Sequence, residues 1–472
     1  MSHETHMIGN VATLAGDAGG RVLSGDQGTT IRAVCTDTRR IEPGDCFIAL
    51  RGENHDGHAF VADAVKKGAD AVIVSEEVSV HPGASAAVIR VSDTLFALGE
   101  IARRHRMRFD MPVIAVSGSN GKTSTKEMVA AILSRTRKVL KNTGNFNNLI
   151  GLPLTLLGLN GEHGAAVVEM GINVPGEMER LAQIGSPTVA VITNIHSAHL
   201  EGLGSLNRIM EEKGRLWQSL GREGVAVVNL DDPMLSRFAE GIKARKITFS
   251  SVDAAADVSI CSPITVSEGK TTFRINAGGL AIPVSLPVMG AHYARNALAA
   301  TAAALSAGAV AEDVAAGLAS FAPVVQRMRC VKLGDSGVLV DDTYNANPGS
   351  MIAALEAVLG ASSGSPFVAV LGEMRELGAE SARLHFEVGR AFGAAKPVGL
   401  IALGDMGVEL LKGAQDAGLD ESLCFHAADH AEAADYLRRV APAGAWILVK
   451  GSRGMTMEKV VQKILSDRGL RD

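Results

Sequence analysis

Aromatic residues and cysteines are scarce in this chain of 472 residues. Aromatic side chains make up only 4% of the sequence, which argues against a surface that binds nucleic acid by stacking on its bases. The cysteines number five, with no C-x-x-C pair, at Cys35, Cys46, Cys261, Cys330 and Cys424. Their odd number and irregular spacing argue against a disulfide framework or a zinc site and indicate reduced thiols.

The sequence also lacks a strong charge of one sign and any long apolar run. Lys and Arg number 46 and Asp and Glu 51, a net charge of -5, so there is no electrostatic reason to expect nucleic acid or a membrane as a partner. No apolar stretch reaches the ~18 residues of a membrane-spanning helix. The opening MSHETHMIGN has no basic segment followed by an apolar run. We therefore expect no secretion signal, no membrane insertion and a cytoplasmic protein.

The length and the pattern of apolar segments predict an α/β protein of three domains. Short continuous apolar runs such as VIAV, AAVVEM and VAVVNL are typical of strands covered on both faces. The stretch KTTFRINAGGLAIPVSLPVMG instead indicates an antiparallel excursion, and the Ala-rich segment after it predicts a long helix. A third block repeats the rhythm with GVLVDD, FVAVLGEM, GLIALG and WILVKGS. We place the domains at residues 1–108, 109–325 and 326–472.

The stretch SGSNGKTST, residues 117–125, resembles a phosphate-binding loop. The common pattern has a glycine five positions before the G-K pair, but Val116 stands there. The loop nevertheless lies between a predicted strand and a predicted helix, and backbone N–H groups at a helix N-terminus form an anion site. Lys122 can contact phosphates and the Thr123 hydroxyl can bind Mg²⁺. This context favours a nucleotide–magnesium site over an ordinary strand-turn-helix loop.

Polar residues further along the chain extend this site. Glu169 ends a buried apolar run, and ligands of open α/β sheets collect beyond the carboxyl ends of strands. A carboxylate there suits the oxygen ligands that Mg²⁺ prefers. The stretch from residue 193 to 217 carries His196, His199 and Lys213, to which spacing alone assigns no role. We interpret His196 as structural.

Several stretches occur in the order found in the Mur ligases, which the chain resembles over nearly its whole length. They are SGSNGKTST, TGNFNNLIGLPLTL, VVEMG, TNIHSAHLEGLGS, GAHYARNALAA and VKGSRGM. That family consists of cytoplasmic, ATP-dependent amide ligases of peptidoglycan synthesis and uses a shorter phosphate loop, typically GTNGKT. Ser119 replaces its commoner Thr. The resemblance implies an N-terminal UDP-substrate α/β domain and a central P-loop ATPase-like domain with a mostly parallel sheet. It also implies a C-terminal Rossmann-like α/β domain that binds the incoming substrate and closes on ATP.

Within the family, DDTYNANPGSM and LGEMRELG resemble the members that join D-alanyl-D-alanine to UDP-N-acetylmuramoyl-tripeptide. Their reaction cleaves ATP to ADP and phosphate by way of an acyl phosphate. The opening TDTRRIEPGDCFIALRGENHDGHAF resembles the UDP-substrate domain shared with the diaminopimelate-adding members, but the D-N-P-R stretch of those members is absent. The alternatives are a diaminopimelate- or lysine-adding Mur ligase and, in another class, a P-loop regulatory ATPase. The third residue of the acceptor peptide, lysine or diaminopimelate, stays open, and we expect a monomer.

The resemblance also implies roles for particular residues. Lys122, Lys213 and His199 are the expected catalytic residues. Thr123 and Glu169 are expected to bind one Mg²⁺, and His199 and Lys213 a second. Because an ammonium group cannot ligate a metal, the alternatives are that Lys213 is carbamylated or that it stays unmodified and pairs with phosphate or a carboxylate. The expected ATP-binding residues are Gly118, Ser119, Asn120, Gly121, Lys122, Thr123, Ser124, Asn296, Arg327 and Asp342.

Two further groups of residues are assigned to the other substrates. The residues expected to bind the UDP-substrate are Thr38, Arg39, Thr143, Asn145, Asn147 and Asn148. Those expected on the side of D-alanyl-D-alanine are Tyr344, Asn345 and Asn347. For the Asn and Thr residues a turn or capping role is the alternative, because these side chains often bond to nearby backbone.

Overall fold

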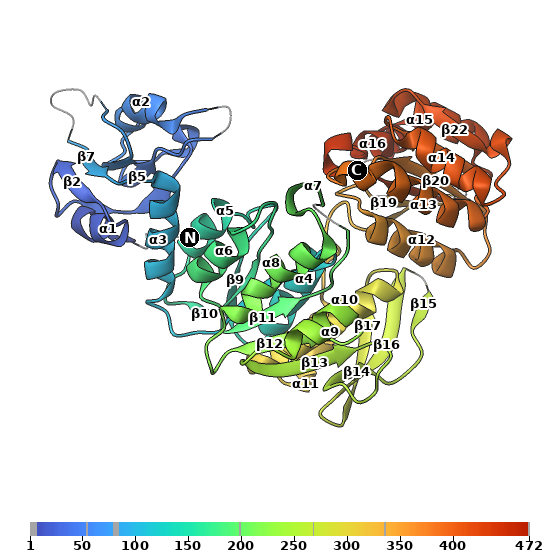
Figure 1. The fold of residues 1–472 in the computed structure, drawn as a ribbon, viewed down its shortest axis with the longest axis horizontal. Coiled ribbons are helices and arrows are strands. Elements are labelled where there is room, and N and C mark those ends of the chain that lie inside the picture. Colours follow the sequence, from blue (N-terminus) through green and yellow to red (C-terminus); the bar gives the residue numbers. More distant parts are fainter. Residues whose placement is uncertain are drawn as a thin grey trace.

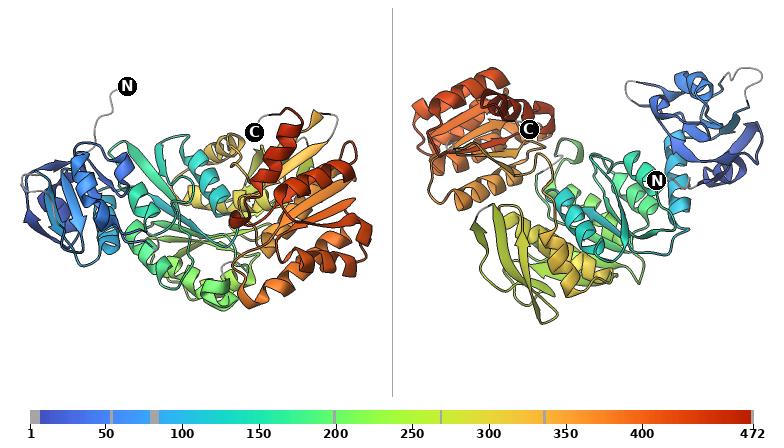
Figure 2. Two further views of the ribbon diagram at one scale, coloured as in Figure 1. Left: turned by 90° about the horizontal axis from the view of Figure 1, so that it is seen from above. Right: turned by 180° about the vertical axis from the view of Figure 1, so that it is seen from behind.

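The computed structural model describes residues 7–52, 55–78, 85–197, 200–267, 269–334 and 337–470. Three large sheets follow one another along the chain, each covered by helices, and the middle sheet lies between the other two (Figure 1). The views from above and behind show the same order (Figure 2). Most neighbouring strands are parallel, so the predicted α/β class is correct.

The N-terminal sheet has five strands in the order β2-β7-β6-β5-β4, with β2 antiparallel to its neighbour. Its strands are β2 (Arg21–Ser24), β4 (Ala33–Cys35), β5 (Asp45–Ile48), β6 (Ala71–Val74) and β7 (Ala87–Arg90). A separate two-stranded sheet pairs β1 (Gly9–Asn10) with β3 (Thr30–Ile31). The helices are α1 (Val11–Asp17), α2 (Val61–Lys66), α3 (Thr94–Arg106) and the 3-10 helices η1 (Thr38–Arg40) and η2 (Gly57–Phe60).

Helix α3 connects this sheet to the middle of the molecule. It packs against α1 on one side and against α5 and α6 of the central part on the other. Arg180 of α6 donates to Glu100 at 2.7 Å and to the Phe96 carbonyl at 3.0 Å. A Cβ at Gly99 would lie 2.7 Å from the Arg180 guanidinium. The absence of a side chain at Gly99 therefore lets the two helices approach.

The central sheet has ten strands, of which β8 to β14 are parallel to their neighbours within that set. Its order is β15-β16-β14-β13-β12-β11-β8-β10-β9, and β17 pairs with β16. The strands are β8 (Val113–Ser117), β9 (Lys138–Lys141), β10 (His163–Glu169), β11 (Val189–Ile192), β12 (Val225–Asn229), β13 (Arg245–Ser250), β14 (Val258–Ile260), β15 (Thr265–Ser267), β16 (Lys270–Ala277) and β17 (Leu280–Leu286). The pairs that β16 makes are antiparallel, as the sequence predicted for this stretch.

Helices cover both faces of the central sheet around β8, β11 and β12, which explains the continuous apolar runs of these strands. Alternate residues of β8 enter different cores: Ile114 and Val116 pack on one face, and Val113 and Ala115 on the other. The central helices are α4 (Lys122–Leu133), α5 (Gly151–Leu156), α6 (Glu177–Gly185), α7 (Leu200–Leu203), α8 (Leu206–Gln218), α9 (Pro233–Ala239), α10 (Ala291–Ser306) and α11 (Ala311–Ala319). A strand in this setting has no polar face to alternate with.

The C-terminal sheet has six strands in the order β18-β19-β23-β20-β21-β22, with only β18 antiparallel. The strands are β18 (Arg329–Lys332), β19 (Val338–Asp342), β20 (Phe367–Gly372), β21 (Gly399–Leu403), β22 (Cys424–Ala427) and β23 (Trp446–Lys450). The helices are α12 (Pro348–Ser362), α13 (Ser381–Ala394), α14 (Gly407–Asp416), α15 (His430–Val440), α16 (Glu458–Asp467) and the 3-10 helices η4 (Gly378–Glu380), η5 (Glu421–Leu423) and η6 (Arg453–Met455). Helix α12 packs against α10 and β15, so the central and C-terminal parts are in contact.

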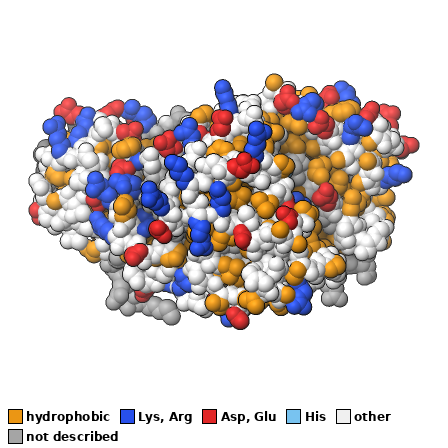
Figure 3. All heavy atoms as spheres, turned by 60° about the horizontal axis from the view of Figure 1, so that its bottom comes forward, with side chains coloured by type: hydrophobic (Ala, Val, Ile, Leu, Met, Phe, Trp, Pro, Cys, Tyr) orange, Lys and Arg blue, Asp and Glu red, His pale blue; other side chains and the backbone are white. Residues whose placement is uncertain are grey.

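The surface mixes charges of both signs. In the space-filling view, Lys and Arg side chains are interspersed with Asp and Glu (Figure 3). All five cysteines are free thiols. Among the described residues, no helix has the length and apolar character needed to cross a membrane.

Candidate active site

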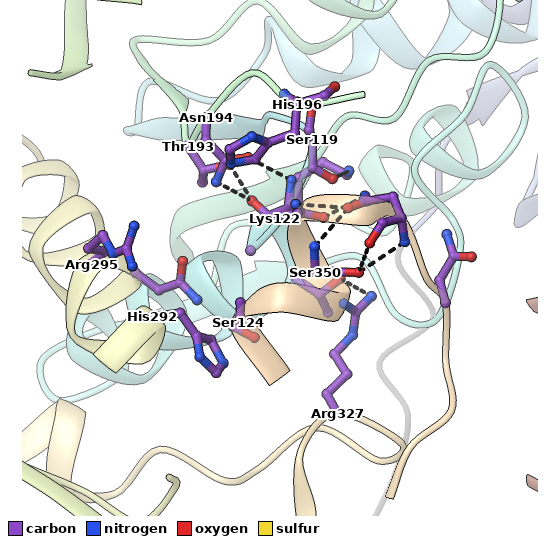
Figure 4. Close-up of a pocket in the computed structure, with 18 of the residues that line it drawn as sticks. Ser119, Lys122, Ser124, Thr193, Asn194, His196, His292, Arg295, Arg327 and Ser350 are labelled. Atoms are coloured by element: carbon purple, nitrogen blue, oxygen red, sulfur yellow. Dashed lines mark hydrogen bonds between the residues drawn. The ribbon is translucent and has the colours of Figure 1, made fainter. Parts of the chain in front are cut away.

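A cavity of about 870 Å³ lies between the central and C-terminal parts (Figure 4). The central part contributes the phosphate loop, the segments after β10, β11 and β12, and the start of α10. The C-terminal part contributes the segments after β19 and β23 and the start of α12. The cavity thus lies at the carboxyl ends of strands from two sheets, where ligands of open α/β sheets bind.

The phosphate loop connects β8 to α4 and depends on two glycines in left-handed conformations. Gly118 has φ +134° and Gly121 has φ +80°. A Cβ at Gly118 would lie 2.0 Å from the Thr193 hydroxyl, and one at Gly121 would lie 2.4 Å from Asn296 Oδ1. Lys122 folds back over the loop and donates to the carbonyls of Gly118 at 2.8 Å and Ser119 at 3.0 Å. Burial lowers its pKa.

The next residue of α4 contacts the predicted metal-binding carboxylate. Thr123 Oγ1 donates to Glu169 Oε2 at 2.7 Å and accepts from Arg327 Nη2 at 3.0 Å. Asn147 Nδ2 donates to the other carboxylate oxygen, Oε1, at 2.8 Å. In the sheet, Glu169 is aligned with Val116 near the end of β8. The parallel pairing of β10 with β8 therefore brings Glu169 to the phosphate loop.

The donor set around Thr123 fits a magnesium ion. Thr123 and Glu169 provide two hard oxygen ligands, and Mg²⁺ is usually held by one or two carboxylates together with phosphates and waters. The described residues contain no cluster of three or more His, Cys, Asp or Glu side chains that could hold a metal alone. Such a site suits a metal ion that arrives with a phosphate ligand.

Lys213 lies in the interior beside this group, while His199 lies outside the described residues. Lys213 is 1% exposed. Burial, and next the positive charge of Lys122, lower the pKa of Lys213 well below its ordinary value. Glu169 and Glu212 oppose this shift. The lowered pKa shifts Lys213 towards its neutral amine form.

Arg327 reaches the phosphate loop from the segment that joins the central and C-terminal parts. Its Nη2 donates a hydrogen bond to Thr123 Oγ1, and the guanidinium lies 4.2 Å from the centre of the Tyr344 ring. Its Nε is buried and has no hydrogen-bond partner among the described residues. The phenol of Tyr293 donates to the Arg327 carbonyl at 3.0 Å. Arg327 therefore has a donor available for an anion in the cavity.

Asp342 lies across the cavity and pairs with a lysine that the sequence analysis did not select. Lys450 Nζ donates to Asp342 Oδ2 at 2.6 Å and to the Asn345 carbonyl at 2.9 Å. The backbone N–H of Met328 donates to Asp342 Oδ1 at 3.2 Å. The motif VKGSRGM contains Lys450, and its position at the end of a buried strand was the available signal.

The predicted nucleotide-side residues line the cavity, except Gly118, which does not belong to its described lining. Asn296 of α10 contacts the phosphate loop at Gly121, and Ser124 lines the wall next to Thr123. Sequence reasoning missed His292 and Arg295, which lie on the same wall (Figure 4). Burial lowers the pKa of His292 to about 4.

His196, which we interpreted as structural, also lines the cavity. Its backbone N–H donates to the Ser119 hydroxyl at 2.9 Å, and that hydroxyl donates to the His196 carbonyl at 3.0 Å. Burial lowers the pKa of the imidazole. His196 therefore holds the phosphate loop through its backbone and presents a neutral ring.

The residues predicted to bind the UDP-substrate fall in two places. Asn145, Asn147 and Asn148 line the cavity, and Thr143 does not belong to its described lining. The side chain of Asn148 accepts from the backbone N–H groups of residues 150 and 151, a capping contact at the start of α5. Thr38 and the exposed Arg39 lie on η1 beside the N-terminal sheet, away from this cavity.

The three residues predicted on the dipeptide side all line the cavity. Tyr344 lies beneath Arg327, and the side chain of Asn345 accepts from the Arg453 backbone at 3.2 Å. Asn347 caps α12 by accepting from Ser350 N at 2.9 Å. Its amide also pairs with Asn120 of the phosphate loop.

The fold and the cavity define a multidomain α/β protein with a phosphate-loop site between two of its sheets. Three family models match it: "Mur ligase family, catalytic domain" over residues 30–106, "Mur ligase middle domain" over 116–304, and "Mur ligase, glutamate ligase domain" over 326–453. The chain belongs to the Mur ligase family.

Individual relatives are similar over almost the whole length. The UDP-N-acetylmuramoyl-tripeptide–D-alanyl-D-alanine ligase of Escherichia coli K12 is 38% identical over 448 residues, 94% of this chain and 96% of that protein. A crystal structure of MurF from Acinetobacter baumannii has a TM-score of 0.89 at 33% identity and covers 98% of this chain and 99% of that one. A MurF ligase from Thermotoga maritima in complex with ADP has a TM-score of 0.81 at 28% identity and covers 93% and 98%.

Proposed function

We propose that this protein joins D-alanyl-D-alanine to UDP-N-acetylmuramoyl-tripeptide in peptidoglycan synthesis and cleaves ATP to ADP and phosphate. The observation that carries the proposal is the cavity between the central and C-terminal parts. In it a complete phosphate loop faces Arg327 and Asp342. Relatives named for this reaction, at 38% identity over nearly the whole chain, support the choice of substrates.

The chemical problem is to bring a peptide carboxylate against the triphosphate of ATP, because both are anions. In the first step a carboxylate oxygen attacks the terminal phosphorus, the bond to the bridging oxygen of ADP breaks, and an acyl phosphate forms. In the second step the amine of the dipeptide attacks the acyl carbon, loses a proton and expels phosphate. Lys122 and Arg327 are the cations that would balance the charge around the transferred group.

Thr123 and Glu169 are the residues that would hold Mg²⁺ on the nucleotide. A bound Mg²⁺ would supply positive charge that stabilises the transferring phosphoryl group. The hydrogen bond between Thr123 and Glu169 fixes the two ligand oxygens 2.7 Å apart. Asn147 keeps the second carboxylate oxygen oriented.

Lys213 would serve a second Mg²⁺ as a carbamate, and His199 is the other ligand that the family resemblance implies for this ion. Carbon dioxide adds to a neutral amine, and the lowered pKa of Lys213 favours that form. The product would be an anion with two oxygen atoms, which are the ligands that Mg²⁺ prefers.

The remaining assignments follow the division of the chain. Residues 1–108 would bind the uridine side through Thr38 and Arg39, residues 109–325 would bind ATP, and residues 326–472 would bind the dipeptide. The segment with Asn145, Asn147 and Asn148 would contact the muramoyl part. Tyr344 and Asn345 are the side chains that we assign to the dipeptide. We expect a monomer acting in the cytoplasm, where ATP and the UDP-linked precursor are available.

Phosphate release tests this function. We expect release from ATP only when UDP-N-acetylmuramoyl-tripeptide and D-alanyl-D-alanine are both present, with little release when either is omitted. Acceptor variants ending in lysine or diaminopimelate identify the preferred third residue. Release with ATP alone would instead support a regulatory ATPase. Release only with a UDP-dipeptide and diaminopimelate or lysine would support another Mur ligase activity.

A further inference from the structure

Lys126 is a buried cation for which the proposed reaction has no direct use. It lies on α4, one helical turn after Lys122, and is 1% exposed. Its ammonium donates to the Asn142 carbonyl at 2.6 Å and lies 2.9 Å from Glu127 Oε1. Taking an ammonium out of water costs several kcal/mol even when it is paired. The burial of the Lys126 ammonium therefore calls for a structural reason.

Asn142, the partner of Lys126, holds Glu169 by its backbone. The Glu169 N–H donates to Asn142 Oδ1 at 2.9 Å, and Asn142 Nδ2 donates to the Glu169 carbonyl at 3.0 Å. The same Nδ2 donates to the Phe146 carbonyl at 2.9 Å. The partners fix the orientation of the amide, because its oxygen faces an N–H group and its nitrogen faces two carbonyls. Asn142 thus ties Glu169 to the following loop.

Two residues of α4, one helical turn apart, therefore hold Glu169 through hydrogen bonds. Thr123 contacts the carboxylate directly. Lys126 holds Asn142, which holds the backbone of Glu169 from both its N–H and its carbonyl. Lys126, Asn142 and Glu169 are 1%, 2% and 4% exposed, so water has little access to these bonds. Two attachments restrict the position of Glu169 relative to Thr123 more than either one would.

We infer that Lys126 and Asn142 are positioning residues for the metal ion, keeping the Glu169 carboxylate at the distance from Thr123 that one Mg²⁺ requires. The inference rests on the proposed function, since it concerns the ion that accompanies ATP. Supporting contacts of this kind orient metal ligands, and their loss typically lowers metal affinity 10–100-fold. The hydrogen bonds of Lys126 and Asn142 go to backbone groups and not to the two proposed ligand oxygens, so neither is assigned as a catalytic residue.

The chain offers a matched control for the charge of Lys126. Lys141 forms an ion pair with the other oxygen of Glu127 but is exposed. Lys126→Met removes the ammonium and keeps a long unbranched side chain, while Lys141→Met removes the ammonium on the other side of the same carboxylate. Glu127 keeps Lys141 as its partner and is itself partly exposed, so Lys126→Met leaves no unpaired buried charge. We therefore expect Lys126→Met to fold with a Tm close to that of the unaltered enzyme.

The test is Mn²⁺ binding, followed by electron paramagnetic resonance, to the full-length protein with excess ADP. We expect Lys126→Met and Asn142→Ala to weaken Mn²⁺ binding about tenfold or more and Lys141→Met to leave it within about twofold. Unchanged Mn²⁺ affinity in folded Lys126→Met would overturn the inference, even if Asn142→Ala fails to fold. The assay needs neither acceptor nor amine. If the unaltered protein binds no Mn²⁺ with ADP, the nucleotide–metal part of the proposed function fails instead.

Discussion

The side-chain amides of Asn120 and Asn347 pair with each other across the cavity. Asn120 Nδ2 donates to Asn347 Oδ1 at 3.2 Å, and Asn347 Nδ2 donates to Asn120 Oδ1 at 2.7 Å. Asn120 belongs to the phosphate loop, and Asn347 begins α12 of the C-terminal part. This reciprocal pair joins the nucleotide site directly to the C-terminal part that contributes Asp342.

Alanine substitutions at Asn120 and Asn347 should distinguish the two roles of Asn347, which pairs with Asn120 and caps α12. Asn120→Ala removes only the pair, whereas Asn347→Ala also removes the cap of α12, which is worth about 1 kcal/mol. We expect both variants to bind ATP more weakly and to have a larger radius of gyration by small-angle scattering. Only Asn347→Ala should also lose about 1 kcal/mol of stability in denaturant unfolding. An unchanged radius in both variants would mean that the pair does not hold the two parts together.

Lys122→Ala should abolish phosphate release and leave binding of the UDP-substrate nearly intact. Its side chain spans the phosphate loop, while the proposed uridine contacts, Thr38 and Arg39, lie beside the N-terminal sheet. Loss of one group that stabilises charge in the transition state costs about 3–4 kcal/mol, or 10²–10³ in rate. Steady-state kinetics and calorimetric titration with the UDP-substrate measure the two effects. An equal fall in affinity and in turnover would contradict the separation of the sites.

Much of the fold follows from local sequence because many of the parallel strands are covered on both faces. The runs predicted at VIAV and VAVVNL became β8 and β12, since a strand buried on two faces has no polar positions. Helix α3 also begins at a local signal, because the Asp93 side chain accepts from the Phe96 N–H and caps it. Its packing was not predictable, because contact with α5 and α6 depends on the arrangement of elements that are distant in sequence.

Lys213→Ala tests the carbamate. We expect a rate loss of about 10²–10³ and partial recovery when acetate or formate is added, because these anions can supply the missing oxygen ligands. Alkylamines should not restore activity. Phosphate release measured across a concentration series of each additive gives the comparison. Recovery with amines alone would show that the positive charge of Lys213 is what the reaction needs.

His292 should make stability depend on pH. Its pKa in the folded protein is lowered by burial to about 4, against about 6.5 in an unfolded chain. Below pH 6.5 the unfolded chain binds a proton that the folded protein does not, so stability is lost as the pH falls towards 4. The slope is at most about 1.4 kcal/mol per pH unit.

The comparison is between the unaltered protein and His292→Asn, unfolded by urea at pH 7 and pH 5. We expect the unaltered protein to lose about 1–2 kcal/mol more than the variant over this interval. The difference isolates His292 from the other histidines, which are present in both proteins. Parallel stability curves would show that His292 does not titrate in this way.

The candidate site was predictable where a motif is continuous and not where it is assembled from distant strands. The phosphate loop and Glu169 were found because each carries its own local signal. Lys450 was missed because it is 108 residues from Asp342, and the two become neighbours only through the parallel register of β19 and β23. Lys126 was missed because a lysine on a helix is usually solvated, and only the structure shows its burial.

The most direct test of the central claim is the mass of the product formed from ATP, UDP-N-acetylmuramoyl-tripeptide and D-alanyl-D-alanine. The account predicts a UDP-linked pentapeptide whose mass equals that of the two substrates less one water, with one ADP and one phosphate per amide bond. Parallel reactions should give no product from a UDP-dipeptide with diaminopimelate or lysine. A product only in those parallel reactions, or ADP formed without any new amide, would contradict the account.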